Sequence, residues 1–349
     1  MQMCKEVKYE MSRARLEEIL ERIGSVRAGL IGDLCLDVYW HADMRKSELS
    51  RETPHYPLPV IKERMSLGGG ANAAANIAAL SPKQAEVFGV VGSDWRGREL
   101  VRLMEGQGIG FSGIAVDQGR LTNAYIKPIR KGHSDVEYED PRIDFASYTL
   151  IDAEIEDKLI AELDKAAMVL DILCVSDQLP FGVITERVRG HICELAHRGL
   201  RVVADSRYNI DFFSGCILKP NEIEGARATG VDPESLSDIK ACSEAASILS
   251  GKTGSDVFMT LGAKGSLCLV GGQLWHISSH EISGPIDFCG AGDSALSGFG
   301  LSLAAGAMPW EAAYVAGLCS EVTIRQIGVT GTASREQVLQ WHNELSVHT

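Results

Sequence analysis

The sequence predicts an α/β protein in which a mostly parallel β-sheet lies between two layers of helices. Short apolar runs such as "AGLIGDL", "EVFGVVG" and "LRVVADS" alternate with helix-like segments along the chain. This alternation is typical of strand–helix–strand units, whose crossover connections make neighbouring strands parallel. At 349 residues, with 45% hydrophobic residues, the chain is long enough to bury a large core.

The chain is expected to open with an amphipathic helix, because Leu16, Ile19, Leu20 and Ile23 repeat at helical spacing. Five strands are then expected at "AGLIGDL", "EVFGVVG", "MVLDILCVS", "LRVVADS" and "DVFMTLG". Helix-like segments lie at about 71–80, 97–107, 183–198, 238–250, 291–305 and 310–325. The "SREQ" that begins at Ser334 fits a capping box and predicts a last helix.

Two segments interrupt this rhythm. Residues about 38–62 are rich in charge and proline, and residues about 120–146 combine the strand-like "NAYIKPIR" with the acidic "DVEYED". We interpret both as excursions from the sheet that form a small β lid on a single domain spanning residues 1–349.

Composition excludes several classes of protein. The net charge of −13 and the pI near 5.2 argue against a nucleic-acid-binding surface, which needs dense Lys and Arg. No run approaches the roughly 18 apolar residues of a membrane span, and the first residues lack the apolar core of a secretory leader. The nine Cys form no C-x-x-C pair, which favours a reducing compartment. A cytoplasmic protein without a membrane or nucleic-acid partner is expected.

Polar residues follow the expected strands at the point where each strand ends. Because ligands of open α/β sheets bind at the carboxyl ends of the strands, these residues are expected to converge on one crevice. A single Asp in such a place is more often a helix cap or a turn residue than a catalyst. Six residues in the same topological position weaken that explanation: Asp33, Asp37, Asp177, Asp205, Asn221 and Glu224.

Two glycine-rich turns lead into helices, "GGGANAAAN" and "CGAGDSAL". Such turns offer free backbone N–H groups and the positive end of a helix dipole, so they are candidate anion sites. Neither matches G-x-x-x-x-G-K-[ST], and no G-x-G-x-x-G opens a helix after the first strand, which disfavours P-loop and dinucleotide-binding proteins. From the residues alone, Asp293 is either a general base beside this turn or a cap of the following helix.

"DFCGAGDSALSGFG" resembles the C-terminal signature of the pfkB, or ribokinase-like, carbohydrate kinases, D-T-x-G-A-G-D, and "GGGANAAANIAAL" resembles their N-terminal signature. "KPNEIE" at 219–224 and "TLGAKG" at 260–265 match the family's N-x-x-E and T-x-G-x-x-G motifs in the same order. The resemblance implies a ribokinase-like three-layer α/β/α sandwich with a small β lid. It also implies a kinase that transfers the γ-phosphoryl group of ATP to a sugar or sugar-phosphate hydroxyl.

Site residues follow from the same resemblance. Asp293 would be the base, and the amides of Gly290, Ala291 and Gly292 would form the anion hole. Asn221 and Glu224 would organise Mg²⁺ through water, and Thr260, Gly262 and Gly265 would line the nucleotide. The sugar hydroxyls would be held by residues from the first strands and the lid: Asp33, Asp37, Gly69, Asn72 and Asp177. Phe288 stands where the family has a small residue, which leaves a requirement for a monovalent cation open.

A narrower resemblance concerns the acceptor. "GDLCLDVYW", "RIDF" at 142–145 and "RQIGVTGTAS" are similar to the kinase half of bacterial heptose 7-phosphate kinases, which implies a phosphorylated sugar with Arg142 or Arg51 near its phosphate. Three alternatives stay open: a solvated lid of mixed charge, a kinase for an unphosphorylated sugar or nucleoside, and a catalytically silent sugar- or nucleotide-sensing protein. A homodimer that pairs through lid strands is expected by resemblance.

Overall fold

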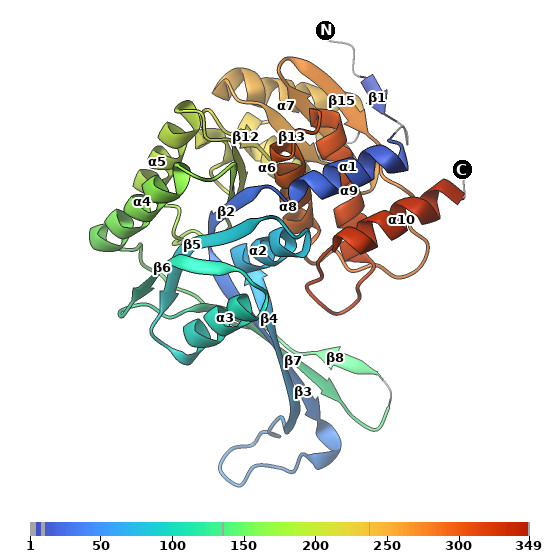
Figure 1. Ribbon diagram of the computed structural model, residues 1–349. Coiled ribbons are helices and arrows are strands. Elements are labelled where there is room, and N and C mark those ends of the chain that lie inside the picture. Colours follow the sequence, from blue (N-terminus) through green and yellow to red (C-terminus); the bar gives the residue numbers. More distant parts are fainter. Residues whose placement is uncertain (1–4, 8–10, 135, 237, 348–349) are drawn as a thin grey trace.

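The computed structural model describes residues 5–7, 11–134, 136–236 and 238–347. Its centre is a ten-stranded sheet with the order β1-β15-β14-β13-β12-β11-β10-β2-β5-β6 (Figure 1). The pairs from β13 to β6 along this order are parallel, whereas β14 is antiparallel to both of its neighbours. In chain order the strands are β1 Lys5–Val7, β2 Arg27–Gly32, β5 Gln84–Gly92, β6 Gly110–Asp117, β10 Ile172–Asp177, β11 Val202–Ser206, β12 Ile217–Leu218, β13 Val257–Thr260, β14 Ser266–Val270 and β15 Gln273–Ile277.

Helices cover both faces of this sheet. On β10, Ile172 and Cys174 belong to one hydrophobic core and Leu173 and Val175 to the other, as the two-residue period of a strand requires. The first core is completed by α1 Arg13–Ile23, α2 Gly70–Ala79, α3 Trp95–Gly106, α8 Ala291–Ala304, α9 Pro309–Ile324 and α10 Arg335–Val347. The second is completed by α4 Ala153–Ala167, α5 Glu186–His197, α6 Glu222–Thr229 and α7 Ile239–Thr253. The predicted three-layer α/β/α architecture is confirmed.

The five strands expected from the sequence are β2, β5, β10, β11 and β13, and the expected helices are α1, α2, α3, α5, α7, α8, α9 and α10. Helix α4 was not expected, although Ile155, Leu159 and Leu163 repeat every four residues and Asp152 caps its first turn. The antiparallel end of the sheet, β13 to β15, was not anticipated either.

A second, five-stranded sheet lies at the lower end of the molecule in Figure 1. Its strands are β3 Leu34–Asp43, β4 Val60–Gly69, β7 Asn123–Lys131, β8 Glu137–Glu139 and β9 Ile143–Phe145. The two excursions set apart from the sequence contribute to it, and β3 follows β2 after the single residue Asp33. We call these five strands the lid sheet; that it acts as a lid, and that residues 1–349 form one domain, stay predictions. Among the described residues, no helix combines the length and the apolar character that crossing a membrane requires.

Candidate active site

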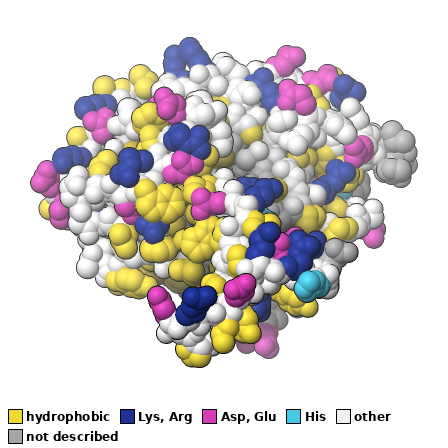
Figure 2. All heavy atoms as spheres, turned by 90° about the horizontal axis from the view of Figure 1, so that it is seen from below, with side chains coloured by type: hydrophobic (Ala, Val, Ile, Leu, Met, Phe, Trp, Pro, Cys, Tyr) yellow, Lys and Arg dark blue, Asp and Glu magenta, His cyan; other side chains and the backbone are white. Residues whose placement is uncertain are grey.

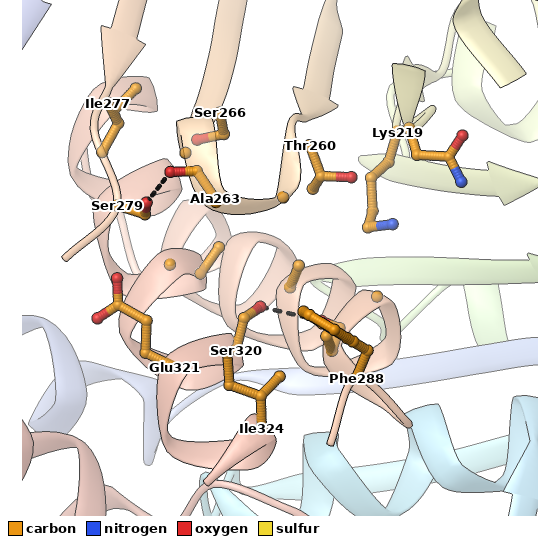
Figure 3. Close-up of a pocket in the computed structure, with 18 of the residues that line it drawn as sticks. Lys219, Thr260, Ala263, Ser266, Ile277, Ser279, Phe288, Ser320, Glu321 and Ile324 are labelled. Carbon is orange, nitrogen blue, oxygen red and sulfur yellow. Dashed lines mark hydrogen bonds between the residues drawn. The ribbon is translucent and has the colours of Figure 1, made fainter. Parts of the chain in front are cut away.

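A cavity of about 1100 Å³ opens at the carboxyl ends of β11, β12 and β13. Its walls come from the start of α6, the turn before α8, the loop after β15 and one side of α9. Figure 3 shows Lys219, Thr260, Phe288 and Ser320 facing this space from four different elements. The crevice predicted at the strand ends therefore exists, and the glycine-rich turn before α8 forms part of it.

Asp293 lies in the first turn of α8, which follows the glycine-rich turn. Gly290 has φ of +82°, a left-handed conformation that a side chain would strain. Within the described part of the chain, the Asp293 carboxylate does not accept a backbone N–H of its helix; its Oδ2 accepts a hydrogen bond from Asn72 Nδ2 at 2.7 Å. The arrangement disfavours a cap and leaves the carboxylate at the edge of the cavity.

The surroundings of Asp293 raise the pKa of its carboxyl into the neutral range. Burial is the main cause that raises its pKa from 3.8 to about 7, while the hydrogen bond from Asn72 works against it. Asp205 and Asp37 raise the pKa further, and Lys219 lowers it. A carboxyl with a pKa near 7 is matched to general-base chemistry at neutral pH.

Lys219 is a buried cation beside the glycine-rich turn. Its Nζ lies 2.6 Å from Asp205 Oδ2, and the two side chains are 3% and 9% exposed. Burial works to lower the pKa of Lys219, but Asp205 and Glu224 raise it overall, so the amine stays charged. A Cβ built on Gly292 would lie 3.8 Å from Nζ, which places this charge at the amides of the turn. Sequence reasoning missed Lys219, although a Lys at the end of the apolar "CILKP" run was a usable signal.

Asn221 and Glu224 form the capping box of α6. Asn221 Oδ1 accepts from the Glu224 N–H and Glu224 Oε2 accepts from the Asn221 N–H, both at 2.9 Å. Each side chain thus has a structural role and keeps its second polar atom outside the box. Burial, followed by Asp205, raises the pKa of Glu224.

Hard oxygen donors of this kind suit Mg²⁺. Among the described residues, no group of three or more His, Cys, Asp or Glu side chains could hold a metal ion by itself. Asn221 and Glu224, at the start of α6, are the oxygen donors of the cavity that could hold such an ion.

Thr260, Gly262 and Gly265 surround the turn between β13 and β14 and line the cavity. Thr260 forms an isolated parallel bridge with Asn221, which joins this turn to the start of α6. Gly265 has φ of +89°, and a Cβ on it would collide with the carbonyl oxygen of Ile277. Glycine is therefore required there by both conformation and space.

On the lid side, Asp37 lies beside Gly68, and Gly69 directly precedes α2, the helix that carries Asn72. Asp37 lies on β3, is 6% exposed and accepts a hydrogen bond from Thr330 Oγ1 at 3.0 Å. Burial raises its pKa, and Lys127 on β7 is the first of the charges that oppose this. Gly69 has φ of +52°, and a Cβ there would lie 2.7 Å from the Asp33 carbonyl oxygen. The charge of Asp37 is one of the causes that raise the pKa of Asp293.

Two residues expected to hold sugar hydroxyls, Asp33 and Asp177, have buried carboxylates that bond to neighbouring loops. The Asp33 carboxylate is 1% exposed and accepts backbone N–H groups of Gln178, Leu179 and Val183 at 2.7–2.8 Å. Asp177 is 2% exposed, and its Oδ2 accepts from Ser206 Oγ and Asn209 Nδ2. Both carboxylates hold loops in place and have no surface left for a ligand.

Arg142 is exposed on the lid sheet and forms a bidentate ion pair with Asp144 at 2.6 and 2.7 Å. Its guanidinium also stacks over the Tyr125 ring, 4.2 Å from the centroid. The positive charge expected to meet a sugar phosphate is therefore already neutralised.

The loop of residues 326–331, here called the late loop, connects the lid sheet with the glycine-rich turn. Asp287 Oδ2 accepts from the Gly328 N–H at 3.0 Å, and Arg64 Nη2 donates to the Gly328 carbonyl at 2.8 Å. Thr330 completes the link through Asp37. Phe288, next to Asp287, is 70% exposed and extends along the cavity wall (Figure 3).

Solved structures share this fold. A structure of phosphofructokinase-2 from Escherichia coli in complex with potassium superposes with a TM-score of 0.72, covering 92% of this chain and 99% of that one at 19% identity. Arabidopsis thaliana ribokinase complexed with ribose and ATP gives a TM-score of 0.68, covering 91% and 99% at 18% identity. The fold is therefore that of the ribokinase-like sugar kinases.

Comparison with known sequences identifies the family. A family model for pfkB family carbohydrate kinases matches residues 216–336. The chain is 31% identical to the bifunctional protein HldE of Citrifermentans bemidjiense over 342 residues, and 31% identical to that of Geotalea uraniireducens over 336. These alignments cover 95% and 94% of this chain but only 66% and 65% of those proteins. The chain belongs to the pfkB family of carbohydrate kinases.

Proposed function

We propose that this protein transfers the γ-phosphoryl group of ATP to a hydroxyl of a sugar or sugar phosphate. The observation that carries the proposal is the position of Asp293, a carboxyl with a pKa of about 7 beside the Gly290 turn and the charged Lys219. Family membership and the sugar-kinase fold support it.

In this mechanism Asp293 accepts the proton of the attacking hydroxyl. The backbone N–H groups of Gly290 to Gly292 and the Lys219 ammonium stabilise negative charge on the phosphoryl group in transfer. Thr260, Gly262 and Gly265 border the nucleotide, and Asp37 and Asn72 hold acceptor hydroxyls. Asn221 and Glu224 would hold Mg²⁺, which supplies charge neutralisation to the phosphates when it is bound.

The test is ADP release on a panel of sugars and sugar phosphates, with ATP, Mg²⁺, and either K⁺ or Na⁺. We expect acceptor-dependent ADP release that is lost in Asp293→Asn. Heptose 7-phosphate is the first acceptor to try because of the resemblance to heptose 7-phosphate kinases. ADP release that never depends on an acceptor would contradict the kinase function and favour a sensing protein.

We also propose that two copies pair through the lid sheet. The first four residues of β4, Val60 to Glu63, are exposed on both faces of the strand, and Ile61 is 61% exposed. Figure 2, which views the molecule from below, shows apolar side chains interspersed with charged ones on this face. A strand without a covering layer is an expected contact surface for a second copy. Sedimentation should show a dimer that Ile61→Lys converts to a monomer; a monomeric wild type would contradict the proposal.

A further inference from the structure

Arg207 is a cation of the active-site cavity. It follows β11 directly, is exposed, and lines the same cavity as Asp293, Lys219 and Glu224. Across the described ranges of the chain, no carboxylate lies within ion-pair distance of its guanidinium, whereas Lys219 pairs with Asp205, Arg142 with Asp144 and Arg130 with Asp140. An arginine without a counter-ion keeps its full set of donors for an anion that enters from solvent.

The backbone of Arg207 is fixed although its side chain is free. Its N–H donates to the Asp177 carbonyl at 2.9 Å, and its own carbonyl accepts from Arg227 Nη1 at 2.6 Å. The buried hydrogen bond from Ser206 Oγ to Asp177 holds the preceding residue as well. The side chain therefore extends from a fixed backbone position, so a ligand has to order the side chain alone.

The electrostatic reach of Arg207 extends to both sides of the crevice. Burial is the main cause that raises the pKa of Glu224 on α6. Burial also raises the pKa of Tyr125 on β7 to about 12. The positive charge of Arg207 opposes the increase in both residues. The hydrogen bonds of its backbone to Asp177 at the end of β10 and to Arg227 on α6 place Arg207 between these two elements, at the wall of the cavity. The transferred phosphoryl group already has the amides of the glycine-rich turn and Lys219, so Arg207 is left for a second anion in the crevice.

We propose that Arg207 selects an acceptor that carries its own phosphate ester. The inference rests on the proposed kinase function and assigns the specificity to Arg207 in place of Arg142, which Asp144 already neutralises. The planar guanidinium binds two oxygens of the ester, and the hydroxyl to be phosphorylated then lies toward Asp293.

The experiment compares heptose 7-phosphate with the free heptose in wild type, Arg207→Gln and Arg207→Lys. The matched control is Arg198→Gln, directly after α5, where Arg198 is 64% exposed and pairs with Glu194. We expect wild type to prefer the ester, and Arg207→Gln to lower kcat/KM for the ester by about 10- to 100-fold. KM for ATP and kcat/KM for the free sugar should not change. The kcat/KM of Arg207→Lys for the ester should lie between those of wild type and Arg207→Gln, because lysine keeps the positive charge but lacks the planar guanidinium that binds two oxygens at once.

Equal losses for both acceptors, or a loss confined to KM for ATP, would overturn the assignment and leave the kinase function intact. So would a wild type that prefers the free sugar, or a sugar acid that depends on Arg207 while the ester does not.

If no acceptor is phosphorylated, the kinase function fails and binding decides the assignment of Arg207. An increase in Tm with the ester that is present in wild type and absent in Arg207→Gln supports it. An increase that survives the substitution, or no increase in wild type, overturns it.

Discussion

Asn72 Nδ2 lies 2.7 Å from Asp293 Oδ2, so the two glycine-rich motifs meet in one hydrogen bond between α2 and α8. The contact occupies one oxygen of the carboxylate. The other oxygen accepts no hydrogen bond from any described residue and is available to a hydroxyl. Asn76 supports the arrangement, because its Nδ2 donates to the Asn72 carbonyl and its Oδ1 accepts from Ser294 Oγ. Asn72 therefore fixes the direction of the carboxylate that we propose as the base.

Asp293→Asn should reduce kcat by roughly 10²- to 10⁴-fold, because the amide keeps the shape of the carboxylate but cannot accept the proton. The measurement is steady-state ADP release with saturating acceptor, and circular dichroism serves as the control for folding. A kcat close to that of wild type would show that Asp293 is not the base.

The activity should depend on the charge of Asp293. With a pKa of about 7, the carboxylate is the active form, so kcat/KM should rise with pH and reach a plateau above about pH 8. Asn72→Ala removes a hydrogen bond that favours the charged form, so the midpoint of this rise should move to higher pH. Profiles of the two proteins that coincide would mean that Asn72 does not influence the base.

The same burial has an effect on stability. The folded-state pKa of Asp293 lies above the unfolded value of 3.8, so its contribution is most favourable below that value and is lost as pH rises through about 7. Asp293→Asn, which has no charge to bury, should therefore have a Tm at least about 2 °C above wild type at pH 8. This difference should shrink at pH 5. A difference independent of pH would contradict the assigned cause.

Lys219→Met should be strongly destabilising, because it leaves the Asp205 carboxylate buried without its partner, a loss of about 3–5 kcal/mol in the free energy of unfolding. The double variant Lys219→Met with Asp205→Leu should recover much of this stability but not the activity. Urea unfolding measures the first effect and ADP release the second. If the double variant is as active as wild type, Lys219 has no role at the phosphates.

Asp37→Ala should weaken acceptor binding by about 1–3 kcal/mol and leave the KM for ATP unchanged. The physical reason is that the Asp37 carboxylate lies on the lid side of Asp293, away from Thr260 and Gly262. A higher KM for ATP with an unchanged KM for the acceptor would show that Asp37 acts on the nucleotide side of the crevice.

The central sheet and most of its helices were predictable, because their apolar residues repeat with the periods of buried strands and amphipathic helices. The order of the strands was not, since β10 pairs with β2 across more than 140 residues of chain and local patterns carry no such information. The strands β14 and β15 were missed for the same reason: their antiparallel pairing depends on the β13 neighbour.

The candidate site was predictable as a set of positions but not as a set of roles. Asp293 and Asn72 come together as their motifs implied, although the hydrogen bond between them had no signal in the sequence. Asp33 shows the limit, because an Asp after a strand has the same local sequence whether its carboxylate meets a ligand or, as here, three backbone amides. Only the packing of the loop at 178–183 distinguishes the two.

The late loop joins the lid sheet to the residue that precedes the glycine-rich turn, so a movement of the lid sheet would act on that turn. Gly328 receives Arg64 of the lid sheet on its carbonyl and presents its N–H to Asp287, which directly precedes the glycine-rich turn. Thr330 holds Asp37 of the same lid sheet. If the lid sheet moved outward to admit a sugar, one of two things would happen. The hydrogen bonds that the late loop makes with Arg64 and Asp37 would break, or the late loop would move with the lid sheet and displace Asp287. Opening of the lid sheet would thus change the position of Asp287 and of the amides that we propose as the anion site.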